Sequence, residues 1–179
     1  MTTVNLLKNG MLAVVLGFAS AAAMAQNGEM EAGDFVERAT AKGIAEIEAG
    51  RLALENSGND RVQSFAQTMI DDHTRMNEKL KSIAREKNLE VADDATLMDQ
   101  GKVMIMQLRD GDGFDRHYMG NQVNAHEQSI ELFEEASQNL TDQELRELAQ
   151  ESLPKLREHL AKAQQLHSAL EAQDEADDN

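Results

Sequence analysis

Three histidines stand among apolar residues at the spacing of amphipathic helices, in three separate parts of the chain. Residues seven apart lie on one face of a helix. His73 shares its face with Ala66 and Leu80, His126 with Met119 and Phe133, and His159 with Leu145 and Leu166. Each imidazole is therefore predicted to point into the core. Imidazole nitrogens are common ligands of transition metals, so three that meet would form a metal site.

The places of these histidines along their helices predict that they do meet. Each lies within about two residues of its predicted helix midpoint, which is about 3 Å at the helical rise. Midpoints of an up-down bundle share one level. In the helix predicted over 34–56, Glu46 lies near the same level on an apolar face. The predicted site is one ion of iron, manganese, zinc or copper, and its ligands are Glu46, His73, His126 and His159; no organic cofactor is predicted.

The same four side chains could instead form a hydrogen-bonded polar layer without metal. A single inward histidine is more often a hydrogen-bonded core residue than a ligand. Burying three imidazoles and a carboxylate without strong partners would cost several kcal/mol, and a divalent ion is one such partner. The sequence leaves both interpretations open.

Neighbouring residues carry further alternatives. Pro154 lies one turn before His159 and predicts either a bend in one helix or a break between two. Gly43 and Gly50 either admit a closely packed neighbour or only add flexibility. Asp72 projects about 100° away from His73, so it is either solvated or an outer hydrogen-bond partner on a neighbouring helix.

Four helices are predicted to position these residues in an all-α antiparallel bundle. The first covers 34–56, and the second starts with Asp60 as its N-cap and runs to Lys87, before Asn88. The third covers 114–138, and the capping box Thr141-Asp142-Gln143-Glu144 opens the fourth. The bundle domain is predicted over 34–172, between a tether at 26–33 and a disordered acidic tail at 173–179.

A short extra helix is predicted in the connection between the second and third helices. Its apolar residues would be Val103, Ile105, Met106 and Leu108. The following Asp110-Gly111-Asp112-Gly113 resembles a calcium loop only superficially, because Phe114 stands where the third oxygen ligand belongs. We interpret this segment as a turn and N-cap.

Residues 1–25 have the features of a secretory signal peptide. Lys8 supplies the positive charge, Met11 to Ala23 is an apolar run too short to span a bilayer comfortably, and Ala23-Met24-Ala25 is a cleavage site. Cleavage after Ala25 predicts a periplasmic protein without membrane insertion. A retained N-terminal anchor is the less favoured alternative.

Composition narrows the classes of function. The formal charge of the 179-residue chain is −16, and such a surface repels nucleic-acid phosphates and anionic lipids alike. No nucleic-acid partner is therefore predicted, whereas an envelope protein partner or a homo-oligomer stays possible. The chain has no cysteine, so packing or a ligand must stabilise it without disulfides.

The chain resembles an exported bacterial family, domain of unknown function 4142. The stretches that carry the resemblance include Asp34-Phe35-Val36, Phe65 to His73, Phe114 to Tyr118, His126, and Leu153 to Leu160. The resemblance implies a ferritin-like bundle but no reaction. Di-iron members of the ferritin-like class use Glu-x-x-His pairs, whereas Ile70, Val123 and Leu156 stand three residues before the inward histidines here. A single ion is therefore expected rather than a di-iron site.

Two functions follow from these observations. The first is a periplasmic metal-binding protein with a role in metal handling, redox chemistry or stress; if it is an enzyme, it is a metal-dependent oxidoreductase. The second is a non-catalytic envelope or stress protein that binds a partner, whose polar layer is only structural. Nucleophilic catalysis is disfavoured, since there is no cysteine and no inward serine one turn from the histidines.

Overall fold

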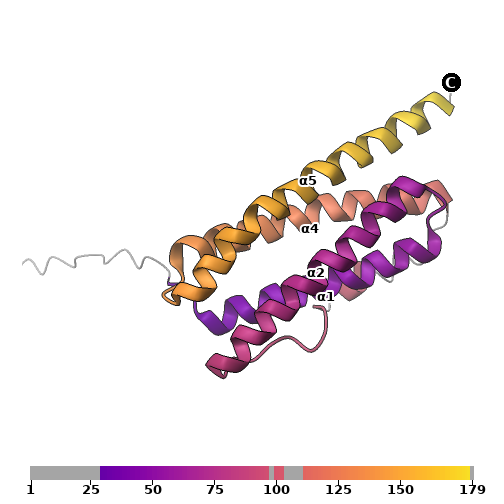
Figure 1. The fold of residues 1–179 in the computed structure, drawn as a ribbon. Coiled ribbons are helices and arrows are strands. Elements are labelled where there is room, and N and C mark those ends of the chain that lie inside the picture. Colours follow the sequence, from indigo (N-terminus) through magenta and orange to yellow (C-terminus); the bar gives the residue numbers. More distant parts are fainter. Residues whose placement is uncertain (1–28, 97–98, 103–110, 178–179) are drawn as a thin grey trace, which may run out of the picture.

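Four long helices make up most of the described chain. The computed structural model describes residues 29–96, 99–102 and 111–177. Its long helices are α1 (Ala32–Asn56), α2 (Asp60–Lys87), α4 (Gly111–Asn139) and α5 (Gln143–Asp177) (Figure 1). They pair as two hairpins, α1 with α2 and α4 with α5, while α2 and α5 pack together more loosely. This confirms the predicted all-α four-helix bundle.

The connection between α2 and α4 contains a short helical stretch at residues 99–102. This stretch lies in the connection for which an extra helix was predicted, just before the residues assigned to it. The four apolar residues assigned to that helix, from Val103 to Leu108, lie outside the described residues. Among the described residues, no helix combines the length and the apolarity needed to cross a membrane.

Two helix caps lie one residue away from their predicted positions. The side chain of Asn59, not Asp60, accepts the Arg61 N–H at 3.0 Å and caps α2. Asp142, not Thr141, accepts the Leu145 N–H at 3.0 Å at the start of α5. Because Asn, Asp and Thr are all good N-caps, sequence alone does not choose between adjacent candidates.

The start of α4 also differs from the prediction. This helix begins at Gly111, so residues 111–113 are helical rather than a turn. At the other end of the bundle, α1 begins at Ala32, within the expected tether, and Met30 bridges to Leu140. Met30 is buried there, which explains why the chain is ordered before the predicted helix start.

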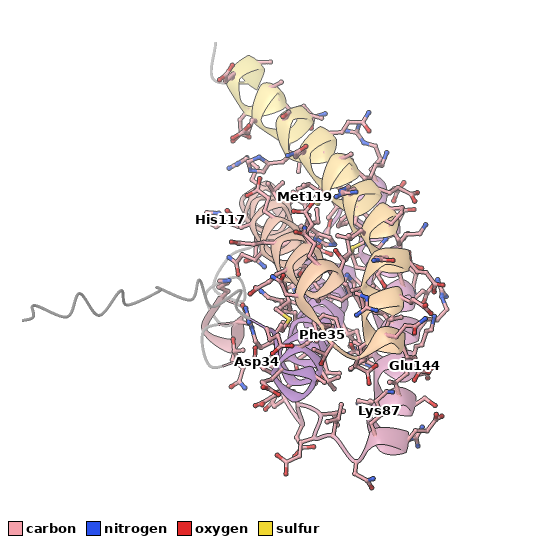
Figure 2. All side chains as sticks on the ribbon, turned by 90° about the vertical axis from the view of Figure 1, so that its left-hand side faces the viewer. Asp34, Phe35, Lys87, His117, Met119 and Glu144 are labelled. Carbon is pink, nitrogen blue, oxygen red and sulfur yellow. The ribbon has the colours of Figure 1, made fainter. Side chains whose placement is uncertain are left out.

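Helix α5 is continuous through Pro154 and extends to Asp177. The break considered at Pro154 is therefore absent, and residues 173–177, expected to be a disordered tail, are helical. Arg116 of α4 forms an ion pair with Asp174, and Leu170 is buried. The ion pair links α5, three residues before its end, to the first turns of α4. The C-terminal turns of α5 project beyond the other helices (Figure 2).

Two apolar clusters fill the bundle and leave a polar layer between them. The first contains Phe35, Leu80, Phe133 and Leu156, and the second contains Phe65, Met69, Tyr118 and Leu166. At the outer end of the first cluster, Lys87 pairs with Asp142 at 2.9 Å and with Glu144 at 3.1 Å, which ties α2 to the start of α5 (Figure 2).

Two glycines set the close packing of α1 against α2. A Cβ on Gly43 would overlap the side-chain amide of Asn77, and one on Gly50 would lie 2.9 Å from Ile70 Cγ1. The buried Asn77 amide donates to the Thr40 carbonyl at 3.2 Å. The interpretation of these glycines as sites of close approach is confirmed.

Candidate metal centre

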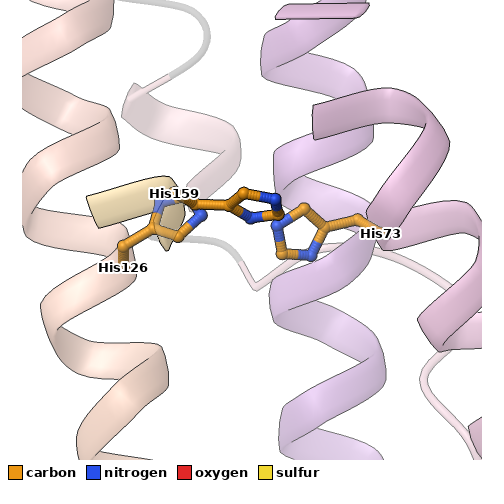
Figure 3. Close-up of side chains that lie close together, drawn as sticks. All are labelled: His73, His126 and His159. Atoms are coloured by element: carbon orange, nitrogen blue, oxygen red, sulfur yellow. The ribbon is translucent and has the colours of Figure 1, made fainter. Parts of the chain in front are cut away.

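The three inward histidines converge at the middle of the bundle. His73 comes from α2, His126 from α4 and His159 from α5, and their exposed fractions are 3%, 1% and 3%. One ligand atom from each lies within 4.8 Å of the other two, and Figure 3 shows the three rings facing one common point. The predicted convergence is confirmed. The spacing of seven residues places each imidazole on its apolar stripe, so the helices themselves aim the rings inward.

Two of the three imidazoles are oriented from outside by hydrogen bonds. His126 Nδ1 lies 2.8 Å from the Gln122 carbonyl oxygen, and His159 Nε2 lies 2.9 Å from Asp72 Oδ2. A nitrogen that faces an oxygen acceptor of this kind carries the proton, so the other ring nitrogen presents a lone pair. The outer contacts thus assign the proton to Nδ1 of His126 and to Nε2 of His159.

Each of the three histidines keeps one buried ring nitrogen without a hydrogen-bond partner. These atoms are Nε2 of His73, Nε2 of His126 and Nδ1 of His159. For His126 and His159 they are the nitrogens that the outer hydrogen bonds leave unprotonated. Buried polar atoms without partners are uncommon and costly, and three in one cluster of imidazoles are the pattern expected of metal ligands.

Asp72 is the outer partner of His159 and not a solvated surface acid. Its side chain is 14% exposed, and its second oxygen pairs with Arg75. A carboxylate behind a ligating histidine fixes the tautomer and makes the inner nitrogen a better donor. The structure therefore decides between the two roles that the sequence left open for Asp72.

Burial keeps His73 and His159 neutral. Desolvation lowers the pKa of His73 well below its usual value, and the neighbouring His126 and His159 lower it further. Desolvation also lowers the pKa of His159, although the hydrogen bond that this ring donates to Asp72 opposes the effect. Near pH 7 both rings are neutral, which is the form that binds a metal ion.

Glu46 is buried at the same level but is not brought into the histidine cluster. Its exposed fraction is 4%, and its Oε2 accepts a hydrogen bond from Gln122 Nε2 at 2.6 Å. Burial raises the pKa of Glu46, while the nearby His126 and the Gln122 bond lower it. Of the four predicted ligands, the structure groups the three histidines and places Glu46 beside them.

Gln122 is the residue that the sequence analysis missed. It is fully buried and lies one turn before His126, on the same face of α4 as Met119. Its side chain binds Glu46, and its backbone carbonyl orients His126. The sequence does contain a signal for this role, because Gln122 is a polar residue on the apolar stripe of α4 and lies four residues before His126.

The spacing of the rings fits one ion. The ring centroids lie 5.6 Å apart for His73 and His126, 5.8 Å for His73 and His159, and 5.4 Å for His126 and His159. With nitrogen–metal bonds of about 2.0–2.1 Å, three rings around one ion would have centroids roughly 5.2–5.5 Å apart. Small ring rotations would close that difference.

The donor set narrows the chemistry available to the centre. Three neutral imidazoles suit zinc, copper, iron or nickel. Three protein ligands also leave a fourth position free in a tetrahedral site, as in catalytic rather than structural zinc sites. The carboxylate-rich di-iron arrangement is not formed by these residues.

The chain belongs to the family described as domain of unknown function DUF4142, whose family description matches residues 17–166. This membership agrees with the resemblance drawn from the sequence and carries no assigned reaction. No curated protein matches the chain.

Among solved structures, the chain is similar to a secreted DUF305 protein from Streptomyces coelicolor. The TM-score is 0.68 at 11% sequence identity, and the match covers 78% of this chain and 93% of the other. At that identity the similarity establishes a shared helical fold and nothing about the site.

Proposed function

We propose that the protein binds a single transition-metal ion through His73, His126 and His159. The observation that carries this proposal is the set of three buried ring nitrogens without partners, all in one cluster. Asp72 and the Gln122 carbonyl hold two of the rings in the tautomer that a metal requires. Glu46 supplies a buried carboxylate beside His126 that partly balances the charge of the ion.

The bound ion supplies Lewis acidity or, if it is iron or copper, one-electron redox chemistry. The roles of the chain are to present neutral donors, to fix their tautomers and to bury the ion between two apolar clusters. These roles support metal handling or an oxidant-related function.

The test is metal binding by the purified mature chain. Elemental analysis should find about one equivalent of metal, and added zinc, copper, iron or manganese should raise the thermal unfolding midpoint. His126→Ala should abolish both effects. His167→Ala is the matched control, since His167 lies outside the cluster and pairs with Glu171. Metal-free wild type without stabilisation by any of these ions would favour the structural role of the polar layer instead.

The same proposal includes export. Lys8, the apolar run to Ala23 and the Ala23-Met24-Ala25 site support removal of residues 1–25 and loading of the ion in the periplasm. N-terminal sequencing of the protein isolated from its native compartment should begin at Gln26. A start at Met1 in a membrane fraction would indicate a retained anchor.

A further inference from the structure

The two sides of the polar layer differ sharply in their access to solvent. Between α1 and α4, beside Glu46, lies a hollow of about 10 Å³ lined by Lys42, Asp99 and Ser129 among others. Between α2 and α5 lies a groove of about 610 Å³. The buried centre is therefore approached from the α2–α5 side, where the two helices pack loosely.

This groove reaches residues of the histidine centre itself. Its lining includes Arg61, Phe65 and Met69 from α2, and His159, Ala161 and Lys162 from α5. His159 belongs to both the groove and the cluster. Met69 lies one turn before His73 on the same face of α2 and is fully buried. The groove thus contains one proposed ligand, His159, together with a residue that precedes His73 by one turn of α2.

The chemistry of the groove indicates its occupant. Neutral imidazoles add no negative charge and Glu46 balances the charge of a bound ion only in part, so an open fourth position favours an anionic ligand. Phe65 at the floor and the exposed Ala161 beside it are the apolar residues of the lining. At the rim, Glu158 is paired with Lys155 at 2.8 Å, and the other charged lining residues are Asp60, Arg61 and Lys162. The volume lies within the usual range for small-molecule sites, about 300–1,000 Å³.

We propose that the α2–α5 groove binds a small organic anion whose acidic group coordinates the ion beside His159 and whose apolar part lies against Phe65 and Ala161. The inference rests on the proposed function, because the anion binds through the ion. It assigns a ligand class that the three histidines alone do not specify.

The experiment uses the mature chain loaded with cobalt(II), whose absorption spectrum reports its ligands. Azide should change the visible bands of the loaded wild type, and carboxylates should then displace azide. Benzoate should bind at least about 5-fold more tightly than acetate, because its ring buries apolar surface on the floor. Ala161→Trp, which fills the groove, should weaken benzoate at least 10-fold while cobalt affinity stays within 2-fold.

Gln164→Trp is the matched control, because Gln164 is an exposed α5 residue that does not line the groove. It should bind benzoate as the wild type does, and circular dichroism should report equal helix content in both tryptophan variants. Equal affinity for acetate and benzoate, or unchanged benzoate binding in Ala161→Trp, would overturn the inference.

Two further outcomes separate this inference from the proposed function. If cobalt binds but azide changes nothing, the fourth position is closed and only this inference fails. If azide changes the spectrum of the Met69→Leu variant but not that of the wild type, the thioether of Met69 is the fourth ligand. That result would also overturn the anion site. If cobalt does not bind at all, the proposed function fails, and the anion site fails with it.

Discussion

Removal of the Asp72 carboxylate should weaken metal binding without removing any proposed ligand. Asp72 Oδ2 lies 2.9 Å from His159 Nε2, and its side chain is only 14% exposed. Loss of such an outer partner typically costs about 10–100-fold in metal affinity, so Asp72→Ala should weaken zinc binding by that factor. Asparagine keeps a neutral acceptor of the same shape. A charge-assisted hydrogen bond is roughly twice as strong as a neutral one. Asp72→Asn should therefore lose about half of the binding free energy that Asp72→Ala loses, or about 3–10-fold in zinc affinity.

The assay is competition for zinc against a chromophoric chelator at pH 7.5. Asp71→Ala is the matched control, because the Asp71 carboxylate accepts only a surface hydrogen bond from Gln67 in the same helix. The control should bind zinc as the wild type does. Equal affinities for Asp72→Ala and Asp71→Ala would refute the claim that the carboxylate prepares His159 for a metal.

Three further predictions concern stability. Gly43→Ala should lower the free energy of unfolding by about 1–3 kcal/mol, because its methyl group would overlap Asn77; urea denaturation should find no such loss in Gly58→Ala, where the space is open. Burial lowers the pKa of His73, so below about pH 6.5 the unfolded chain takes up a proton that the folded chain does not. The metal-free protein should therefore lose up to about 1.4 kcal/mol per pH unit from this group as pH falls; a His73→Phe variant with the same pH slope would contradict this. Asp142→Ala should cost about 1 kcal/mol in thermal unfolding through loss of the α5 cap, and an unchanged midpoint would argue against that cap.

The fold was predictable because its signals are repeated along the chain. The apolar stripes of four segments, each several turns long, specify both the helices and the faces that meet. The inward histidines were predictable for the same reason, since His73, His126 and His159 each occupy a stripe position near a helix midpoint. Burial of all three then follows from the periodicity alone.

Details set by one residue or by one rotamer were not predictable. Asn59 and Asp142 cap their helices although Asp60 and Thr141 would have served equally well by type. The extension of α5 to Asp177 depends on a contact with Arg116, which no local pattern reports.

The immediate partners of the candidate centre depend on which helices lie side by side. Asp72 is one residue from His73 yet bonds to His159 of α5, because successive helical residues diverge by about 100°. Glu46 points inward as expected, but Gln122 holds its carboxylate. The groove between α2 and α5 likewise arises from their loose packing and leaves no signature in either helix.

The most direct test of the central claim is an anomalous-scattering measurement on crystals of the zinc- or copper-loaded protein. The account predicts a single anomalous peak about 2.0–2.2 Å from Nε2 of His73, Nε2 of His126 and Nδ1 of His159. A metal peak elsewhere in the molecule would contradict the account. So would a crystal soaked with the metal that shows no peak in the bundle.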